Sequence, residues 1–419
     1  MKHQHIGFSV AAALAAVFAV PAHAIDMTAG DWKFSVDGNV NVDYIYSKCE
    51  NTPAAIVTVG GACTRSVNSS SVSNVGNGLL PAAITFGMST TQAGLDIAAH
   101  FGFYPGIATN DGGSPNLQAT TGGPTNVALG TTGLDIRQVY MTFGNKDIGT
   151  FTLGRNFGLF GFDAIINDMT LPGVGVAGSE STAQPANTSL GSIGFGYLYV
   201  DTLAQIDYTS PDFAGFNFTL GIFDPVNSLT EPGTAIPKTA PGFHGKVTFT
   251  MPLAGEGNKL YLSSSGIVQK QNYDVGGVAG DFSSRGVDFF AKLDLSGFEF
   301  AGSYYHGNGM GTTGLFILAD DGLGHARKSD GYLLQATYAL GQLKLGVNYG
   351  ASNLDFASAP DAATTPNLLS RNSKFTEGAY YSLTKNLTLL AELSEVKTQA
   401  HNDAENKSTN FNVGAFMSF

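Results

Sequence analysis

Apolar and polar residues alternate along the stretch from Trp32 to Tyr46, which reads WKFSVDGNVNVDYIY. Its even positions are apolar or Gly, and its odd positions are polar up to Ile45. Successive side chains of a β-strand point to opposite faces, so this period-two pattern predicts a strand with one apolar and one polar face. Because most strands have about 5–6 residues, a strand of this length needs an unusually tall apolar environment.

The same alternation recurs in sixteen segments, which begin near residues 32, 79, 95, 134, 149, 196, 215, 242, 258, 285, 298, 331, 342, 374, 386 and 409. Short turns alternate with long polar loops, at about 47–78, 105–132, 157–195, 224–241, 269–284, 307–330, 351–373 and 397–408. No segment after residue 24 keeps a helical period, and no linker divides the chain. We therefore expect a single all-β domain over residues 25–419.

A transmembrane antiparallel β-barrel of 16 strands explains this arrangement. Backbone N–H and C=O groups cannot stay unpaired in hydrocarbon, and a closed barrel leaves no free strand edge. From Trp32 to Tyr44, a strand rising about 3.3 Å per residue and tilted by about 45° covers roughly 28 Å, close to the ~25 Å apolar band of such barrels. The apolar row would face lipid, and the polar row would face a water-filled interior. A secreted β-sandwich or propeller is the alternative, and the long strands disfavour it.

The first 24 residues have the features of a signal peptide. Lys2 supplies a positive charge, residues 6–20 form a predominantly apolar run, and Ala22-His23-Ala24 fits a cleavage site. An N-terminal anchor is the alternative, but this run is shorter than the ~20 residues of a membrane span. We expect the mature chain to begin at Ile25, with both termini and the short turns on the periplasmic side and the long loops outside the cell.

Composition narrows the possible partners. Charged residues make up 13% of the chain, against roughly 25% in soluble domains. The net charge is -12, with 33 acidic and 21 basic residues, and this argues against nucleic acid, because phosphate binding needs clustered Lys and Arg. In a channel the same acidic excess predicts a weak preference for cations.

Cys49 and Cys63 are the two cysteines of the chain. In an exported protein a disulfide between them is expected, and it would tie down the polar loop 47–78. A metal site is the alternative, but other metal-binding residues are missing nearby.

Several motifs carry a family resemblance. They are Arg137-Gln138, the segment Gly149–Asn156 (GTFTLGRN), Asp163-Ala164, Asp168-Met169 with Leu171-Pro172, the pair of segments Tyr208–Pro211 and Phe213–Phe216, and the C-terminal Phe419. With these motifs the chain resembles the general trimeric porins of Gram-negative outer membranes. The detailed match covers roughly residues 133–223.

The resemblance implies a third loop, from about 157 to 195, that folds into the barrel and carries acids facing an arginine ladder on the wall. Arg137 falls on a ladder position, Arg155 falls on a nearby wall position, and Asp163 and Asp168 fall on the acidic stretch of the loop. The family usually has Glu after Leu-Pro, where this chain has Gly173.

Glu180 could replace that missing acid. As alternatives to these roles, the two arginines would be polar wall residues, and the two aspartates would be turn or N-cap residues.

The resemblance also implies a homotrimer in the outer membrane, in contact with lipid and lipopolysaccharide. Phe419 resembles the family's assembly signal, which implies the barrel-assembly machinery as a partner during biogenesis. The expected function is passive diffusion of small hydrophilic solutes and ions. A substrate-selective channel for sugars, carboxylates or aromatic acids is the alternative, and an outer-membrane enzyme or adhesin is less favoured.

Enzyme chemistry, cofactors and resident metals are not expected. The histidines after residue 24 lie in different segments, and H-E-x-x-H, G-x-S-x-G and P-loop motifs are missing. Asp96 and His100 share one strand face, where lining of the wall is favoured over acid–base work. Asp320 and Asp321 could bind divalent cations, but solvated loop charge is the favoured interpretation.

Overall fold

The computed structural model describes residues 25–50, 54–63, 70–107, 134–178, 187–228 and 238–419. The expected signal peptide, residues 1–24, and Glu180 lie outside this part of the chain.

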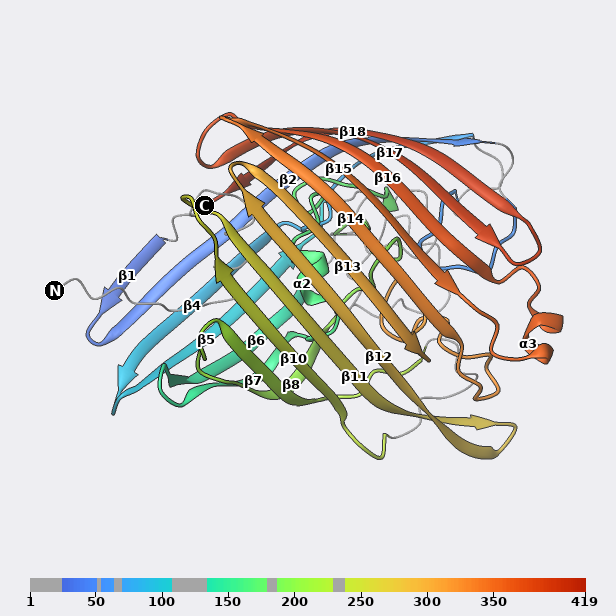
Figure 1. Ribbon diagram of the computed structural model, residues 1–419, viewed down its shortest axis with the longest axis horizontal. Helices are drawn as coiled ribbons and strands as arrows, with labels where there is room; N and C mark the ends of the chain where they lie inside the picture. The colour runs from blue at the N-terminus through green and yellow to red at the C-terminus, as the bar shows by residue number, and fades with distance from the viewer. Residues whose placement is uncertain (1–24, 51–53, 64–69, 108–133, 179–186, 229–237) are drawn as a thin grey trace.

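Within the described residues, sixteen antiparallel strands form a closed barrel, as the sequence predicts (Figure 1). These strands are β2 (Trp32–Glu50), β4 (Ala83–Gln92), β5 (Leu95–Pro105), β6 (Leu134–Asn145), β7 (Gly149–Phe157), β8 (Thr202–Thr209), β9 (Phe216–Phe223), β10 (Gly242–Pro252), β11 (Lys259–Val275), β12 (Val278–Leu295), β13 (Phe298–Asn308), β14 (Lys328–Leu340), β15 (Leu343–Leu354), β16 (Leu369–Ser382), β17 (Leu387–Ala400) and β18 (Glu405–Ser418). Two short strands, β1 (Ile25–Ala29) and β3 (Ser71–Gly76), pair with the start and the end of β2.

The two faces of the wall follow the predicted alternation. On β2 the side chains of Val40, Val42 and Tyr44 are 40–46% exposed, whereas Asn41 and Asp43 are 0% exposed. The apolar row therefore covers the outside of the barrel, and the polar row faces the lumen. Of the helices in the described residues, none is long and apolar enough to cross a membrane.

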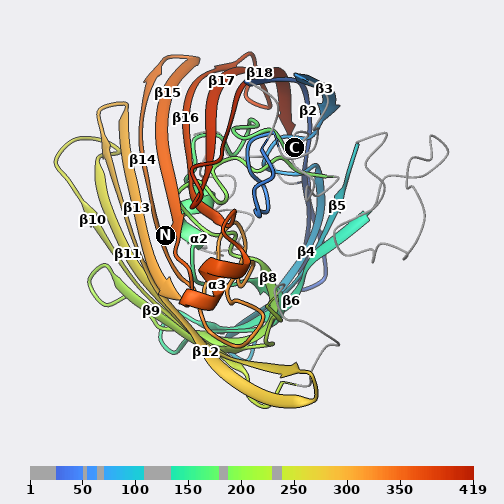
Figure 2. The same cartoon turned by 90° about the vertical axis from the view of Figure 1, so that its right-hand side faces the viewer.

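Long and short connections lie at opposite ends of the barrel. In Figure 1 the helix α3 (Ala359–Thr364) and the long loops lie at the right-hand end, and β1 lies at the left-hand end with the short turns. Figure 2 looks at the long-loop end and shows the helix α2 (Phe162–Ile166) inside the ring of strands. The prediction of a long loop at 269–284 is wrong. There β11 continues to Val275 and β12 begins at Val278, because Gly276 and Gly277 adopt the positive φ angles (62° and 86°) of a tight hairpin turn.

The last residue of the chain completes the closure of the barrel. β18 pairs with β2, and beyond it the N–H and C=O of Phe419 exchange two hydrogen bonds of 3.0 Å with Gly38. The Phe419 ring lies so close that a Cβ atom at Gly38 would come within 2.6 Å of it. Glycine at position 38 therefore leaves the space that this terminal ring occupies.

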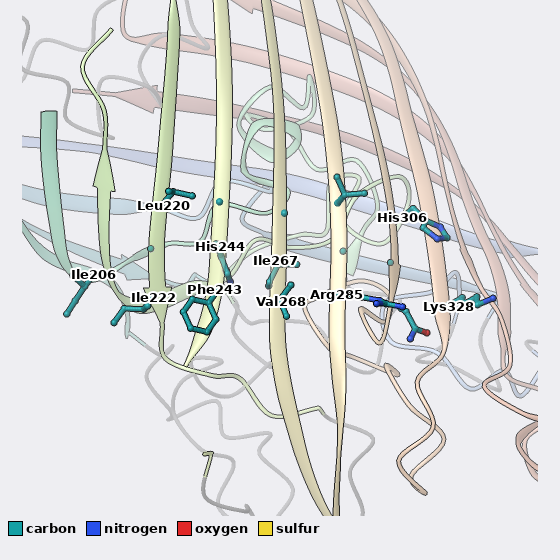
Figure 3. A pocket seen from close by; sticks show the side chains of 17 residues that line it. Ile206, Leu220, Ile222, Phe243, His244, Ile267, Val268, Arg285, His306 and Lys328 are labelled. Atoms are coloured by element: carbon teal, nitrogen blue, oxygen red, sulfur yellow. The ribbon is translucent and has the colours of Figure 1, made fainter. Parts of the chain in front are cut away.

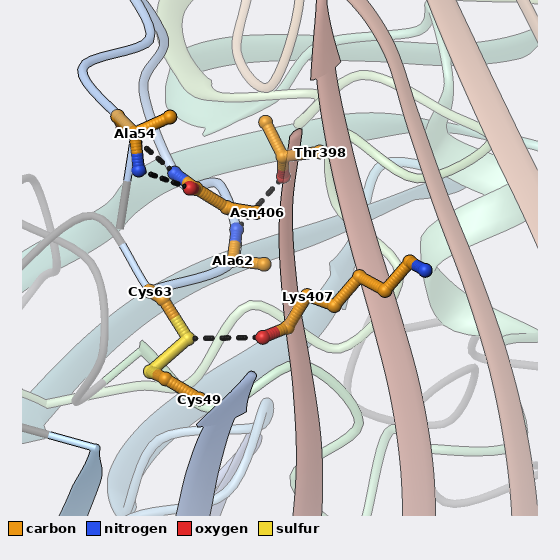
Figure 4. Close-up of a disulfide and its surroundings, with 7 residues drawn as sticks. All are labelled: Cys49, Ala54, Ala62, Cys63, Thr398, Asn406 and Lys407. Atoms are coloured by element: carbon orange, nitrogen blue, oxygen red, sulfur yellow. Dashed lines mark hydrogen bonds between the residues drawn. A yellow bond between two sulfur atoms is a disulfide. The ribbon is translucent and has the colours of Figure 1, made fainter. Parts of the chain in front are cut away.

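The expected disulfide joins Cys49 to Cys63 (Figure 4). The sequence placed Cys49 in the polar loop, but it lies on β2, which continues to Glu50. The segment 54–63 is attached to the inner face of the wall, because the Ala62 N–H donates to Thr398 Oγ1 (2.8 Å) and the Ala54 N–H donates to Asn406 Oδ1 (2.6 Å). The disulfide thus holds this first loop over the lumen.

Replacing Cys49 and Cys63 together by serine should lower the free energy of unfolding by about 3 kcal/mol, because a loop of this size gains roughly that much conformational entropy in the unfolded chain. Urea unfolding of the refolded barrel, followed by heat-dependent gel migration, measures the change. Wild-type protein that has been reduced and alkylated should match the double variant. An unchanged midpoint in both samples would contradict the prediction.

Candidate functional site

The third loop connects β7 to β8, and its described residues, 158–178 and 187–201, lie in the lumen, as the sequence predicts. Gly161 starts α2 with a φ of 77°, a left-handed conformation that glycine adopts at little cost. The loop then contacts the inner faces of strands on the far side of the barrel.

The first part of the loop is held by β10, β11 and β12. The Asp163 carboxylate lies 2.7 Å from the ammonium group of Lys246 on β10 and accepts a hydrogen bond from Ser263 on β11. The N–H of Gly161 donates to Asp288 on β12. Asp163 therefore faces a lysine of the wall rather than an arginine.

Asp168 organises the middle of the loop. It is fully buried, and its Oδ1 accepts hydrogen bonds from the Thr170 N–H (3.0 Å) and from Asn348 on β15 (3.2 Å). Its Oδ2 accepts from the Ser192 N–H (3.0 Å) and the Tyr197 hydroxyl (2.8 Å). Both carboxylate oxygens are thus engaged in fixing the loop to itself and to the wall.

Glu392, on β17, places a buried carboxylate beside Gly173. Its carboxylate accepts hydrogen bonds from the N–H groups of Val174 (3.0 Å) and Gly175 (2.8 Å). A Cβ atom at Gly173 would lie 2.0 Å from Glu392 Oε1, so a side chain at position 173 and this carboxylate cannot both be accommodated.

We did not identify Glu392 from the sequence. The alternation of Leu389, Ala391 and Leu393 around it does place it on the inward face.

Arg137 points inward from β6. Its Nε lies 2.7 Å from Asp135 on the same strand, and its guanidinium group donates to Asn187 of the third loop (3.1 Å). The guanidinium carbon lies 5.4 Å from the centre of the Tyr104 ring. Arg137 is therefore an inward-facing cation in contact with the loop, with Asp135 as its counter-charge.

A β-bulge sets the position of Arg137. Gly102 of β5 pairs with Gln138, and the next residue, Phe103, pairs with Ile136, so Arg137 is the extra residue between them. Bulges redirect side chains in this way, and here Arg137 and Gln138 are both buried on the inner side.

Arg155 occupies a different position. The strand register places it opposite Val139 and Ala204, which are exposed on the outer face. The structure thus brings Arg137, Asp163 and Asp168 to the interface between the third loop and the inner wall, and it does not bring Arg155 there.

A second loop, residues 309–327 between β13 and β14, also folds inward, which the sequence analysis missed. Its residues Met310, Leu315 and Phe316 are buried in one cluster with Phe160 of the third loop. The Tyr199 N–H donates to the carbonyl of Thr313 (2.7 Å) and joins the two loops directly. The apolar run GLFILA at 314–319 was the available signal.

Arg327 anchors this second loop at its outer end. Its guanidinium group donates two hydrogen bonds to Asp361 of α3, with distances of 2.8 and 2.7 Å. Burial alone would raise the pKa of Asp361, but the hydrogen bonds from Arg327 and Ala357 hold this pKa below its ordinary value.

Asp320 is buried and accepts a hydrogen bond from Ser228 (2.6 Å), so our interpretation of Asp320 as a solvated loop charge is wrong. Asp321 accepts a hydrogen bond from the ring of His325 (2.8 Å). Within the described ranges, no group of three or more His, Cys, Asp or Glu side chains could hold a metal ion.

Carboxylates and cations face the lumen together. The inward carboxylates of the strands and third loop include Asp43, Asp135, Asp163, Asp168, Asp207, Asp288 and Glu392. The inward cations include Arg137, Lys246, Lys292, Lys344 and Lys374. Carboxylates thus prevail in these two sets.

Comparison with protein families finds a match to the family described as Gram-negative porin, over residues 11–401. Curated protein sequences give no match.

Among solved structures, the outer membrane channel DcaP of Acinetobacter baumannii is similar, with a TM-score of 0.68 and 14% identity over 94% of this chain and 99% of that one. OmpF of Salmonella typhi has a TM-score of 0.55 and 12% identity over 94% and 100% of the two chains. OprB of Pseudomonas putida has a TM-score of 0.55 and 12% identity over 93% and 94%. At these low sequence identities, the similarity concerns the fold alone.

Replacing Asp168 by alanine should loosen the third loop. The change removes the acceptor of buried donors on Thr170, Ser192 and Tyr197, at a cost of about 1–3 kcal/mol for each group. Amide hydrogen exchange in residues 187–199 should accelerate at least about tenfold. Asp147→Ala removes a carboxylate that is 72% exposed in a turn and serves as the matched control. Equal protection in both variants would count against this role of Asp168.

Proposed function

The chain belongs to the Gram-negative porins and lies in the outer membrane, and from this premise we propose that it forms a water-filled channel for passive diffusion of small hydrophilic solutes and ions. The third loop carries this proposal, because it crosses the lumen and is held by inward groups of β10, β12, β15 and β17. A loop fixed in this way narrows the path, and a pore selects solutes by shape and charge at its narrowest point.

In this proposal Arg137 and Asp163 border the path where the third loop approaches the wall. Asp168 and Glu392 act on the path indirectly, by holding the loop in place. Arg155 contributes to the wall outside the path, because its strand neighbours are exposed on the outer surface.

A weak preference for cations follows from the charges. The inward carboxylates named above outnumber the inward cations, and the whole chain has a net charge of -12. A lumen lined by excess negative charge raises the local concentration of cations.

Single-channel recording in a planar bilayer under a salt gradient tests the channel and its preference together. We expect ohmic conductance that appears in steps of three. The reversal potential should be displaced toward the equilibrium potential of the cation. Arg137→Gln should shift that potential further toward cations, because it removes an inward positive charge. Lys48→Gln, at an exposed position on the outer face of β2, should leave it unchanged.

A reversal potential on the chloride side would contradict the cation preference, and folded protein without conductance would contradict the channel. Small steps that one added solute blocks would favour the second candidate, a substrate-selective channel. That candidate has one supporting observation: segments 54–63, 158–178, 187–201 and 309–327 pack together inside the barrel and narrow it.

We further propose a homotrimer whose subunit contact includes β16. Glu377 on β16 is exposed on the outer surface between Val347 (43% exposed) and Leu393 (42% exposed). A charge on the lipid-facing surface of a barrel is unfavourable near the membrane centre. Contact with a second subunit would remove this carboxylate from lipid.

Cysteine labelling tests this contact. The cysteine of the Glu377→Cys variant should react slowly with a membrane-soluble maleimide in the native assembly and quickly after dissociation into monomers. Val247→Cys, at an outward position on β10, should react quickly in both states. Fast labelling of Glu377→Cys in the native assembly, or a monomer by native mass spectrometry, would contradict the proposal.

A further inference from the structure

The outer wall has a hollow over β10 and β11. Gly245 and Gly266 face each other directly across these strands, in an outward row that continues to Leu220 on one side and Val287 on the other. A Cβ atom at Gly266 would meet only the Gly286 carbonyl, at 3.7 Å, so the space above it is open. A Cβ atom at Gly245, in contrast, would lie 3.0 Å from the Leu220 side chain, which borders the hollow. The hollow has a volume of about 1020 Å³, which is comparable to ligand-binding sites of about 300–1,000 Å³.

One outward row borders the hollow on the side of the long loops and changes character along its length. Ile222, Phe243 and Val268 begin this row, with 43–54% of each side chain exposed. The row continues directly into Arg285, Asn308 and Lys328 (Figure 3). A ligand of this surface would therefore have an apolar part and an anionic part.

Arg285 and Lys328 are available to bind an anion. In the part of the chain that the structure describes, neither side chain has a hydrogen bond or an ion pair with another described residue, and their hydrogen bonds are those of the backbone. Both are exposed and flank Asn308, and since neighbouring strands lie about 4.8 Å apart, their Cα atoms are roughly 10 Å apart. His306 is exposed on the same face, opposite Asp330, which accepts a hydrogen bond from Asn353 (2.9 Å).

The position along the barrel identifies the headgroup level of the membrane. Phe243 is the second residue of β10, Asn308 is the last residue of β13, and Lys328 is the first residue of β14. The cations thus lie at the long-loop edge of the wall, and Gly245 and Gly266 lie one outward row further into the apolar band. Long cationic side chains at such an edge reach the membrane–water interface.

We propose that this groove binds one phosphorylated lipid of the outer leaflet. Arg285 and Lys328 hold a phosphate of the headgroup through charge-assisted hydrogen bonds, and an acyl chain fills the hollow over Gly245 and Gly266. The site depends on the location of the protein in the outer membrane and not on conduction through the lumen.

Native mass spectrometry of the refolded mature chain in detergent, titrated with bisphosphorylated lipid A, tests the proposal. We expect one tightly bound lipid per subunit. The double variant Arg285→Gln/Lys328→Gln should bind it at least about tenfold more weakly, because it removes two charged donors. Lys48→Gln, which neutralises an exposed lysine at the long-loop end of β2, should bind as the wild type does.

A second variant tests the contact with the acyl chain separately from the contact with the phosphate. Gly266→Leu fills the hollow and leaves both cations in place, and it should also weaken binding about tenfold, since it excludes buried chain methylenes. Heat-dependent gel migration confirms folding of every variant before titration.

Each remaining outcome overturns a stated part of the proposal. Equal binding of lipid A without its phosphates would exclude the headgroup contact. Competition by inorganic phosphate would indicate an anion site without a lipid. Unchanged binding in both the charge variant and Gly266→Leu would exclude the groove as the binding site, whether or not the protein conducts ions.

Discussion

A chain that crosses lipid with strands must pair every backbone N–H and C=O group with another strand, because hydrocarbon offers no other partner. In this protein that requirement is met at the seam between β18 and β2, where the first and last wall strands join. Phe419 extends the seam by two hydrogen bonds to Gly38, and β1 pairs with the start of β2 on the same side. Along its other edge β2 is long enough to pair with both β3 and β4. The positions of all the remaining strands follow from this closure.

A barrel of this size cannot fill its interior with wall side chains alone. Its loops therefore build a second, smaller core inside, from apolar residues such as Phe160, Phe316 and Tyr197. The polar inner face of the wall then satisfies the backbone of the loops: Lys374 donates to the carbonyl of Gly191 (3.0 Å), and Glu392 accepts from two loop N–H groups. The charges of the lumen thus serve the loop structure as well as the solute path.

The outer surface is adapted to lipid, but it is not uniform. Most outward residues are apolar, and two of the polar exceptions differ in their chemistry. Glu377 is a carboxylate among apolar neighbours and suits a protein contact, whereas Arg285 and Lys328 lie at the edge of the apolar band beside a glycine hollow and suit an anionic headgroup. The two proposals thus assign lipid and protein to different sides of the same wall.

The sequence by itself determined the barrel, because period-two alternation, long strands and the order of short and long connections are local properties of the chain. It also placed the third loop in the lumen through the family resemblance and correctly paired Cys49 with Cys63. It could not assign partners to the acids: only the tertiary structure decided that Asp168 is enclosed by loop donors and that Glu392 occupies the space beside Gly173. The physical reason is that alternation fixes the face on which a side chain lies, whereas its partner depends on which distant segment reaches the same depth of the barrel.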